Sequence, residues 1–411
     1  MIYSVDAASI DEIPALVVGF LQSFLRDLIL PSLLSLFYLF CTGSLFFDVI
    51  HYMLHRTNTS SHPLLRRLAR IHRFHHLYFT RHMNFDDKYL WQNLVQALPL
   101  ELGLQIFGTA LGYVLATWAN PIGLVWITQS HLWSMIAIQI IRTTVVILAS
   151  GRDSNHLVYK TAPKDPNWIF AGPEYHALHH VYPDRYIGSF IKLFDWVWGT
   201  SYSVRGKRFV ITGGNGAFGR AIVAELEQEG VQSIRSLKFG VDWDHQNFET
   251  AITALSACDV LILAHGTKGQ DAVESNCNSA VRLVQLFKQS RPINETSPTL
   301  PEVWYVGSEI EFHPAFGNKE LQRYSQSKRR FLPYARSFFD DADILYRHIV
   351  PSAFQSPMGP AILSAHWAAR CTMFWIRRGA RYVPVTYTGF AYLHYFKFMY
   401  LVPYAQGKDK V

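Results

Sequence analysis

Histidines gather in three short clusters in the first half of this 411-residue chain. The clusters are His51 and His55; His72, His75 and His76; and His176, His179 and His180. Spacings of three and four residues put neighbours on one face of a helix, so we expect each cluster to aim its imidazoles in one direction. Eight imidazoles suit two metal ions, and nitrogen ligands without thiolate favour iron, zinc or copper over a structural zinc site.

A second group of residues that could take part in chemistry follows residue 206. Residues 207–212 predict a strand, and Gly213, Gly216 and Gly219 open a helix that continues to about Glu229. Glycines at such a turn let the backbone approach a pyrophosphate at the helix N-terminus. The position of this turn, between a strand and a helix, is the one that a dinucleotide-binding motif requires.

Two further predicted strands, 259–264 and 304–308, end in small or hydroxyl-bearing residues, and a helix with Tyr324 and Lys328 one turn apart follows. A lysine so placed lowers the pKa of the phenol, which can then give or take a proton near neutral pH. Ser308, at the end of the second of these strands, could hold a carbonyl oxygen. By itself, the Tyr324–Lys328 pair would fit an ordinary exposed helix face.

The elements that must position the histidines include segments of membrane length. Residues 28–47 carry no charge, and neither do residues 102–141, which we interpret as a transmembrane hairpin with a turn at Asn120-Pro121. A buried soluble hairpin is the alternative. Residues 13–25 could extend the first helix or lie in the interface, and acidic residues near the N-terminus argue against a signal peptide.

Charge predicts the orientation of these segments. Lys and Arg outnumber Asp and Glu by 38 to 31, and six arginines lie between residues 56 and 81 with no acidic residue before Asp86. Short basic loops stay in the cytoplasm, so both candidate sites are expected to face it. The excess of basic residues next to apolar segments favours a membrane surface over nucleic acid. The four cysteines have no paired or metal-type spacing, which indicates reduced thiols.

The motifs HYMLHR, IHRFHH, YHALHH and DWVWGT resemble the fatty acid hydroxylase/sterol desaturase superfamily over about residues 30–200. The resemblance implies two iron ions held by the eight histidines, with O2 as oxidant, and hydroxylation or desaturation of a sterol or fatty acyl lipid. Iron can activate O2 for attack on a C–H bond beside a bilayer. An external electron donor of the ferredoxin or cytochrome type is expected, because the sequence shows no flavin or haem motif. Plant wax-synthesis proteins that make alkanes from aldehydes are similar in the same way.

Two departures from that family concern the ligand set. Many members have a further histidine before the third box, where this chain has Arg152 or Asp153, with His156 a few residues later. Many also have a His-Pro pair after the second box, where this chain has Leu90-Trp91. We therefore include His156 among the candidate ligands, as a substitute.

The second half resembles a short-chain dehydrogenase/reductase, and the whole chain is similar to bacterial sterol desaturase/short-chain dehydrogenase fusions. The resemblance implies a Rossmann-like α/β domain that binds NADP or NAD. Its implied catalytic residues are Ser308, Tyr324, Lys328 and Asn276, and its implied cofactor-binding residues are Gly213, Gly216, Gly219, Ala264 and Gly266. Arg235 or Lys238 stands where an acidic residue would bind an NAD ribose, which is compatible with NADP.

Only about eleven residues separate Gly230 from Asp242, where that family fits a strand, a helix and another strand. The prediction is thus an α-helical membrane domain over residues 1–203 and a sheet domain over residues 204–411. The aromatic tail, residues 387–404, should lie on the membrane or cover the sheet edge. A lipid oxidoreductase is the expected function, and a membrane scaffold with a decayed nucleotide site is the alternative.

Overall fold

The structure is a computed structural model that describes residues 29–119, 127–291, 299–315 and 317–405. The segment 13–25 and the turn at Asn120-Pro121, both assigned from sequence, lie outside the described residues. The chain divides into two compact units: residues 1–157, 169–176 and 187–194 form the first, and the rest form the second.

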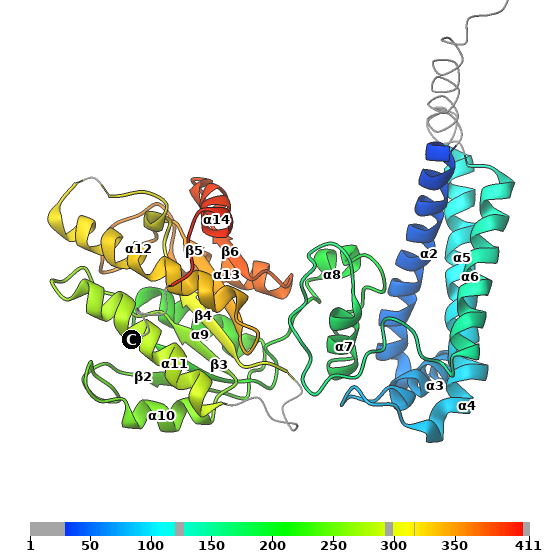
Figure 1. Cartoon of the computed structure of the whole chain (residues 1–411), viewed down its shortest axis with the longest axis horizontal. Helices are drawn as coiled ribbons and strands as arrows, with labels where there is room; N and C mark the ends of the chain where they lie inside the picture. Colours follow the sequence, from blue (N-terminus) through cyan, green and yellow to red (C-terminus); the bar gives the residue numbers. More distant parts are fainter. Residues whose placement is uncertain (1–28, 120–126, 292–298, 316, 406–411) are drawn as a thin grey trace, which may run out of the picture. The chain divides into compact units, whose positions relative to one another are not determined.

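Three long helices build the first unit: α2 (Leu30–Arg56), α5 (Leu98–Ala119) and α6 (Gln129–Leu148). They lie side by side, and the shorter α3 (Pro63–Tyr78) packs at one end of them (Figure 1). A short helix α4 (Leu90–Gln92) and a π-helical turn η4 (Asn93–Ala97) lead into α5. Among the described residues, three helical stretches could cross a membrane by length and composition. Residues 30–47 of the span expected at 28–47 lie in α2, which continues nine residues further.

Small residues bring α2 and α5 close together. A Cβ built on Gly108 would lie 2.5 Å from Phe46 Cβ, and one on Gly112 would lie 2.1 Å from Thr42 Oγ1. Between these helices and α6, the Gln139 amide donates a hydrogen bond of 2.8 Å to Thr109 Oγ1. Close contact of small residues together with interhelical hydrogen bonds is the usual way in which membrane helices associate.

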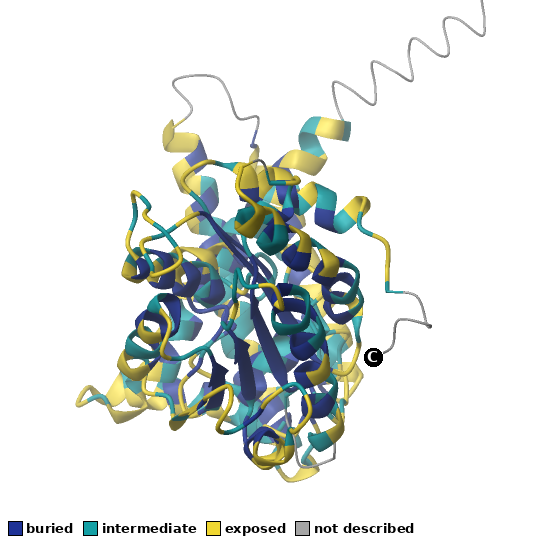
Figure 2. Ribbon diagram, turned by 90° about the vertical axis from the view of Figure 1, so that its left-hand side faces the viewer, coloured by how far each residue is buried: buried dark blue, intermediate teal, exposed yellow. Residues whose placement is uncertain are grey.

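The second unit is built on a six-stranded parallel sheet of order β2-β1-β3-β4-β5-β6. The strands are β1 (Arg208–Thr212), β2 (Ser233–Leu237), β3 (Val260–Leu263), β4 (Glu302–Val306), β5 (Leu345–Pro351) and β6 (Tyr382–Val385). Figure 2 shows the buried strands between layers of helices. The strands predicted at residues 207–212, 259–264 and 304–308 correspond to β1, β3 and β4.

Helices cover both faces of the sheet, and each face has its own apolar core. On one face the core includes residues of α10 (Glu249–Ser256), α11 (Ser279–Ser290), α12 (Lys319–Asp340) and α14 (Phe390–Tyr400). On the other it includes residues of α9 (Ala217–Gln228) and α13 (Ala365–Arg377). The fold is therefore a doubly wound, Rossmann-like α/β domain, as expected.

The shortened segment noted in the sequence has a structural counterpart. Between α9 and α10 the chain forms a single strand, β2, which is an edge of the sheet. The aromatic tail forms α14, whose Ala391, His394 and Phe398 are buried. Its Leu393 and Phe396 are 53% and 59% exposed, so α14 covers the sheet domain and still presents an apolar outer face.

Residues 158–168, 177–186 and 195–203 belong to the second unit. A buried polar network explains part of this assignment. The Tyr202 hydroxyl donates a hydrogen bond of 2.6 Å to Glu302 Oε2 on β4, and Lys207 pairs with the same carboxylate. The four cysteines form no disulfide.

Candidate functional site

The three histidine clusters all lie on helices, as the spacing predicted. His51 and His55 are on α2, the second cluster is on α3, and the third is on α7 (Pro173–Val181). A further short helix, α8 (Leu193–Trp198), contains most of the DWVWGT motif.

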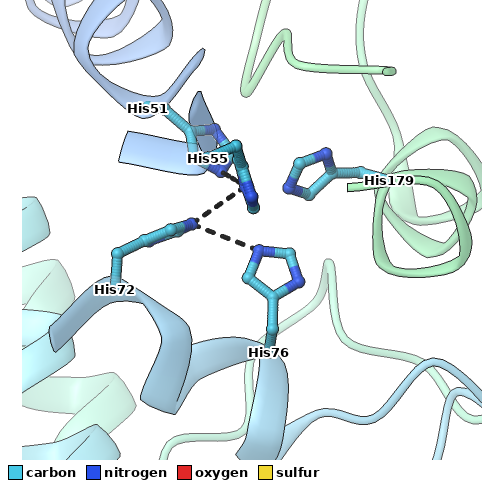
Figure 3. Close-up of side chains that lie close together, drawn as sticks. All are labelled: His51, His55, His72, His76 and His179. Carbon is cyan, nitrogen blue, oxygen red and sulfur yellow. Dashed lines mark hydrogen bonds between the residues drawn. The ribbon is translucent and has the colours of Figure 1, made fainter. Parts of the chain in front are cut away.

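Four histidines of the first unit converge through their Nε2 atoms (Figure 3). Nε2 of His55 lies 3.1 Å from Nε2 of His51 and 3.2 Å from Nε2 of His72, which lies 3.2 Å from Nε2 of His76. Four nitrogens around one ion at the usual 2.0–2.1 Å would be roughly 3.4 Å apart. This group, which we call metal group 1, therefore fits a single transition-metal ion.

Three more histidines of the first unit form a second convergence, metal group 2. His156 Nε2 lies 3.2 Å from His75 Nε2 and 2.9 Å from His176 Nε2. His156 Nδ1 lies 2.7 Å from Asp153 Oδ1, so the carboxylate orients the ring with Nε2 toward the group. A carboxylate behind the histidine is the usual support of a metal ligand.

Two pKa values support this interpretation. Burial lowers the pKa of His75 to about 4, which keeps its imidazole neutral, the form that binds a metal. Burial opposes ionisation of Asp153, but its hydrogen bond and charge interaction with His156 prevail and lower its pKa to about 2. The carboxylate is therefore ionised at neutral pH and can accept the His156 Nδ1–H.

The second cluster does not aim all its rings in one direction, contrary to the sequence-based expectation. His72 and His76 belong to metal group 1, whereas His75 belongs to metal group 2. Three residues near the position of the missing family histidine, Arg152, Asp153 and His156, have different surroundings. His156 lies in metal group 2 and Asp153 supports it, whereas the Arg152 guanidinium lies 4.9 Å from the centre of the Phe85 ring.

His179 and His180 lie one helical turn beyond His176 on α7, in the part of that helix that belongs to the second unit. Their spacing places them on the helix face that carries His176. Their role as ligands stays a prediction from the sequence.

Glu101 is a functional candidate that the sequence analysis did not include. Its carboxylate lies on α5, 3.6 Å from His72 Nδ1 and 3.8 Å from His75 Nδ1, and thus next to a member of each metal group. A cavity beside it is also lined by Gln105, Gln139 and Arg142 of the long helices. An ionisable residue next to a charge-free run of membrane length is a functional candidate by default, so the sequence did carry a signal.

The glycine-rich turn of the second unit follows β1 at the point where β1 separates β2 from β3. A Cβ on Gly219 would lie 2.1 Å from the Gly213 carbonyl oxygen, and one on Gly213 would lie 2.6 Å from the backbone of Ala264. Gly213 also has a positive φ of 73°. The turn, the N-terminus of α9 and the end of β3 thus form a cradle that excludes side chains and fits a pyrophosphate.

A graded pair of substitutions tests this cradle. We expect Gly219→Ala to abolish NAD(P) binding, because the new methyl group would overlap the Gly213 carbonyl. Gly216→Ala is the milder control, since its Cβ would lie 3.2 Å from that oxygen. Titration of each purified variant with NADPH, followed by fluorescence, measures the effect. Equal affinity in Gly219→Ala and the parent would contradict the assignment.

The four expected catalytic residues lie around the carboxyl end of the sheet. Ser308 follows β4, Tyr324 and Lys328 are on α12, and Asn276 is in a π-helical turn, η6 (Glu274–Asn278), before α11. Tyr324 is hydrogen-bonded to Ser308, and its ring centre lies 5.9 Å from Lys328 Nζ. Asn276 accepts a hydrogen bond of 2.8 Å from Thr267 N and donates one of 2.8 Å to Ser327 Oγ.

Burial shifts the pKa values of Tyr324 and Lys328 in opposite directions. Burial raises the pKa of Tyr324 above its usual range, against the effect of the Ser308 hydrogen bond, so the phenol is protonated at neutral pH. Burial lowers the pKa of Lys328 to about 8. Lys328 Nζ donates hydrogen bonds to the Val306 carbonyl at 2.8 Å and to the Tyr305 hydroxyl at 3.3 Å, which fix its position.

The remaining expected cofactor residues are placed as follows. A Cβ on Gly266 would lie 4.0 Å from Tyr324 Cε2, so this turn adjoins the tyrosine that is expected to be catalytic. Arg235 and Lys238 are both exposed. The side chain that meets the glycine-rich turn is Ser236, whose Oγ would lie 2.4 Å from a Cβ on Gly214. Strand alternation puts Arg235 on the opposite face, whereas Lys238, directly after β2, falls on the face of Ser236.

Comparisons with known proteins give one curated relative, and no family model matches the sequence. The relative is a monoglucosyldiacylglycerol epimerase from Synechocystis sp. (strain ATCC 27184 / PCC 6803 / Kazusa), which is 27% identical over 379 residues. The alignment covers 81% of this chain and 90% of that protein. Since residues 204–411 are only about half of the chain, the alignment must extend into the helical first half.

Among solved structures, a short-chain dehydrogenase from Burkholderia cenocepacia J2315 in complex with NADP is 15% identical and covers 48% of this chain and 95% of its own, with a TM-score of 0.39. A short-chain dehydrogenase/reductase from Burkholderia phymatum in complex with NAD is 13% identical and covers 50% and 98%, with the same TM-score of 0.39. The comparisons lend no support to the hydroxylase/desaturase resemblance of residues 30–200, which rests on the motifs themselves.

Proposed function

We propose that this chain is a membrane-bound enzyme whose sheet domain epimerises a sugar carried by a diacylglycerol lipid, with NAD(P) as a recycled hydride carrier. The observation that supports it most is the meeting of Ser308, Tyr324 and Lys328 beside the glycine-rich cradle. The lipid follows from the name of the curated relative and from the three helices of membrane length. Lys238 makes NADP the favoured form of the cofactor.

The residues divide the work of such a reaction among themselves. Gly213, Gly216 and Gly219 would hold the pyrophosphate, and the nicotinamide would supply a hydride acceptor and donor. Tyr324 in its ionised form, which the Lys328 ammonium would favour, would take the proton of a sugar hydroxyl while the carbon of that hydroxyl loses hydride and becomes a ketone. Ser308 can hydrogen-bond the ketone oxygen. When hydride returns to the other face of the ketone, Tyr324 gives the proton back. The carbon is inverted, and no net oxidation occurs.

The direct test incubates the full chain, purified in detergent, with monoglucosyldiacylglycerol and NAD⁺ or NADP⁺. The expected result is the epimeric glycolipid, identified by chromatography of the released sugar, without net accumulation of NADH or NADPH. Accumulation of a ketone together with reduced cofactor would indicate a simple dehydrogenase instead. Absence of any product with both cofactors would contradict the proposal.

Lys328 predicts a particular pH dependence. Its lowered pKa of about 8 means that the ammonium is charged below that pH and is lost as the pH rises through it. Because the charge assists ionisation of Tyr324, turnover is expected to decline above about pH 8. Lys328→Arg keeps the charge at all these pH values and should remove the decline, even if its absolute rate is lower. A parent profile that stays flat to pH 10 would contradict this role.

A second candidate function is O2-dependent oxidation of a lipid at the histidines, and the convergence of Nε2 atoms in metal groups 1 and 2 favours it. The histidines of each group would hold one iron ion, with His179 and His180 as further ligands. Iron so bound would activate O2. Such a reaction needs an external electron donor of the ferredoxin or cytochrome type.

Metal analysis and topology test this second candidate. We expect about two iron ions per purified chain, by analogy with one ion for each group of histidines, and both candidate sites on the cytoplasmic side of the membrane. Zinc in place of iron would remove the redox function. A folded, metal-free protein would favour the alternative of a scaffold in the helical half.

A further inference from the structure

A third cluster of ligand-type side chains lies inside the sheet domain, apart from the nucleotide cradle. It consists of Glu311 in the turn η7 (Glu309–Glu311), His348 on β5 and His394 on α14. All three are 0% exposed, and their donor atoms lie within 4.8 Å of one another. The proposed reaction uses none of them.

The hydrogen bonds of His348 determine which of its ring nitrogens carries the proton. Its Nε2 lies 2.9 Å from Glu311 Oε2 and its Nδ1 lies 3.0 Å from the Tyr346 hydroxyl. A carboxylate can only accept, so Nε2 carries the proton in this arrangement, and Nδ1 accepts from Tyr346.

His394 is in a different position. Its Nδ1 lies 2.7 Å from the Tyr382 hydroxyl oxygen. The Tyr382 hydroxyl already donates its single proton to the Ala391 carbonyl, in a hydrogen bond of 2.8 Å. Nδ1 of His394 must therefore be the donor, and in the neutral ring Nε2 then carries a lone pair. That lone pair lies 4.0 Å from Glu311 Oε2. Among the described residues, neither His394 Nε2 nor Glu311 Oε1 has a hydrogen-bond partner.

The negative charge of Glu311 also lacks a permanent cation. The nearby Lys397 ammonium donates to the backbone carbonyls of Glu311 and Phe312, at 3.2 Å and 2.6 Å, and Lys328 donates to Val306 and Tyr305. In the described part of the chain, the ion pairs of the Glu311 carboxylate are with the two histidines alone. A buried carboxylate facing a buried lone pair is unfavourable unless something positive lies between them.

We propose that Glu311, His348 and His394 bind one divalent transition-metal ion of the zinc type, at a site separate from the histidine boxes. One carboxylate and two imidazoles are a common ligand set for such ions, with a water molecule as the fourth ligand. Glu311 Oε2 lies 2.9 Å from His348 Nε2 and 4.0 Å from His394 Nε2, on either side of the roughly 3.4 Å that separates two ligands of one tetrahedral ion. Metal binding would displace the proton from His348 Nε2. Tyr346 and Tyr382 would hold the ligand rings from behind, as outer-shell partners do.

The ion would join three elements that are far apart in sequence. It would tie α14 and η7 to β5, and thereby fix the C-terminal helix on the sheet. Glu311 is three residues beyond Ser308, so the same ion would also hold the segment that carries this catalytic residue. A structural role is expected, since all three ligands are fully buried.

The test uses the full chain with the histidine boxes disabled, so that only this site can bind metal. The quadruple variant His55→Ala/His72→Ala/His75→Ala/His156→Ala removes two ligands from each metal group. It is stripped with a chelator, checked for folding by circular dichroism, and titrated with Zn²⁺ against a chromophoric chelator. We expect uptake of about one zinc ion per chain and a higher melting temperature. A folded quadruple variant that takes up no zinc would overturn the proposal.

Addition of Glu311→Gln or His394→Gln to the quadruple variant assigns the site. Either change is expected to abolish the zinc uptake, whereas His313→Gln, an exposed histidine two residues beyond Glu311, should leave it unchanged. Uptake that survives both changes would place the ion elsewhere and overturn the assignment. None of these readouts depends on epimerase activity, so failure of the proposed function would not affect them.

Discussion

Replacement of Tyr324 by phenylalanine is expected to lower epimerase turnover by about 10²–10⁴-fold, the usual contribution of a general acid–base group. The substitution removes only the hydroxyl that is hydrogen-bonded to Ser308 and leaves the ring in place on α12. Nucleotide affinity and metal content should be unchanged. The measurement compares the rate of glycolipid epimerisation in the parent and the variant at saturating NAD(P).

Tyr400→Phe is the matched control, because Tyr400 is 75% exposed on α14 and lies outside the proposed machinery. It should keep the parental rate. If Tyr324→Phe also keeps it, with every glycolipid tried, Tyr324 is not the acid–base group, and the sheet domain is better explained as the remnant expected in the scaffold alternative.

Replacement of His156 by alanine is expected to remove about one metal ion per chain, because metal group 2 then loses the histidine that lies between the other two. Metal group 1 does not contain His156, so its ion should remain. Elemental analysis of parent and variant, purified side by side in detergent, gives the result. Epimerase turnover should be unaffected, the reverse of the pattern for Tyr324→Phe.

Two further variants sharpen this experiment. Asp153→Asn keeps the size of the side chain but weakens its hold on His156 Nδ1, and should reduce metal affinity by about 10–100-fold without abolishing it. His82→Ala removes an exposed histidine in a turn and should change nothing. Full metal content in His156→Ala would show that His156 is not a ligand.

Local patterns predicted much of this molecule. The spacing within each histidine cluster predicted a helix, and the apolar runs before Ala264 and Ser308 predicted β3 and β4, because these signals depend on residues close together in the chain. The dinucleotide cradle was equally accessible, since a strand, a glycine-rich turn and a helix follow one another directly.

Features that depend on several distant elements were not predicted. Helical spacing places His75 and His76 on adjacent positions of α3, but only packing against other elements sends one to each metal group. Glu311, His348 and His394 come from a turn, a strand and a helix, with no common spacing. The unit boundary likewise depends on Tyr202 meeting Glu302, a hundred residues later.

α2 and α5 pack so closely where they cross that no further atom fits between them. This close packing also affects the position of a functional group elsewhere on α5. Gly108 meets Phe46 with no room for even a methyl group, and Glu101 lies seven residues earlier on the same rigid helix, about 10 Å away. A substitution that separated the helices at Gly108 would move the Glu101 carboxylate away from His72 and His75. The position of the Glu101 carboxylate beside two candidate metal ions thus depends on the close packing at Gly108. A single added carbon atom at Gly108 would displace the carboxylate without altering any ligand.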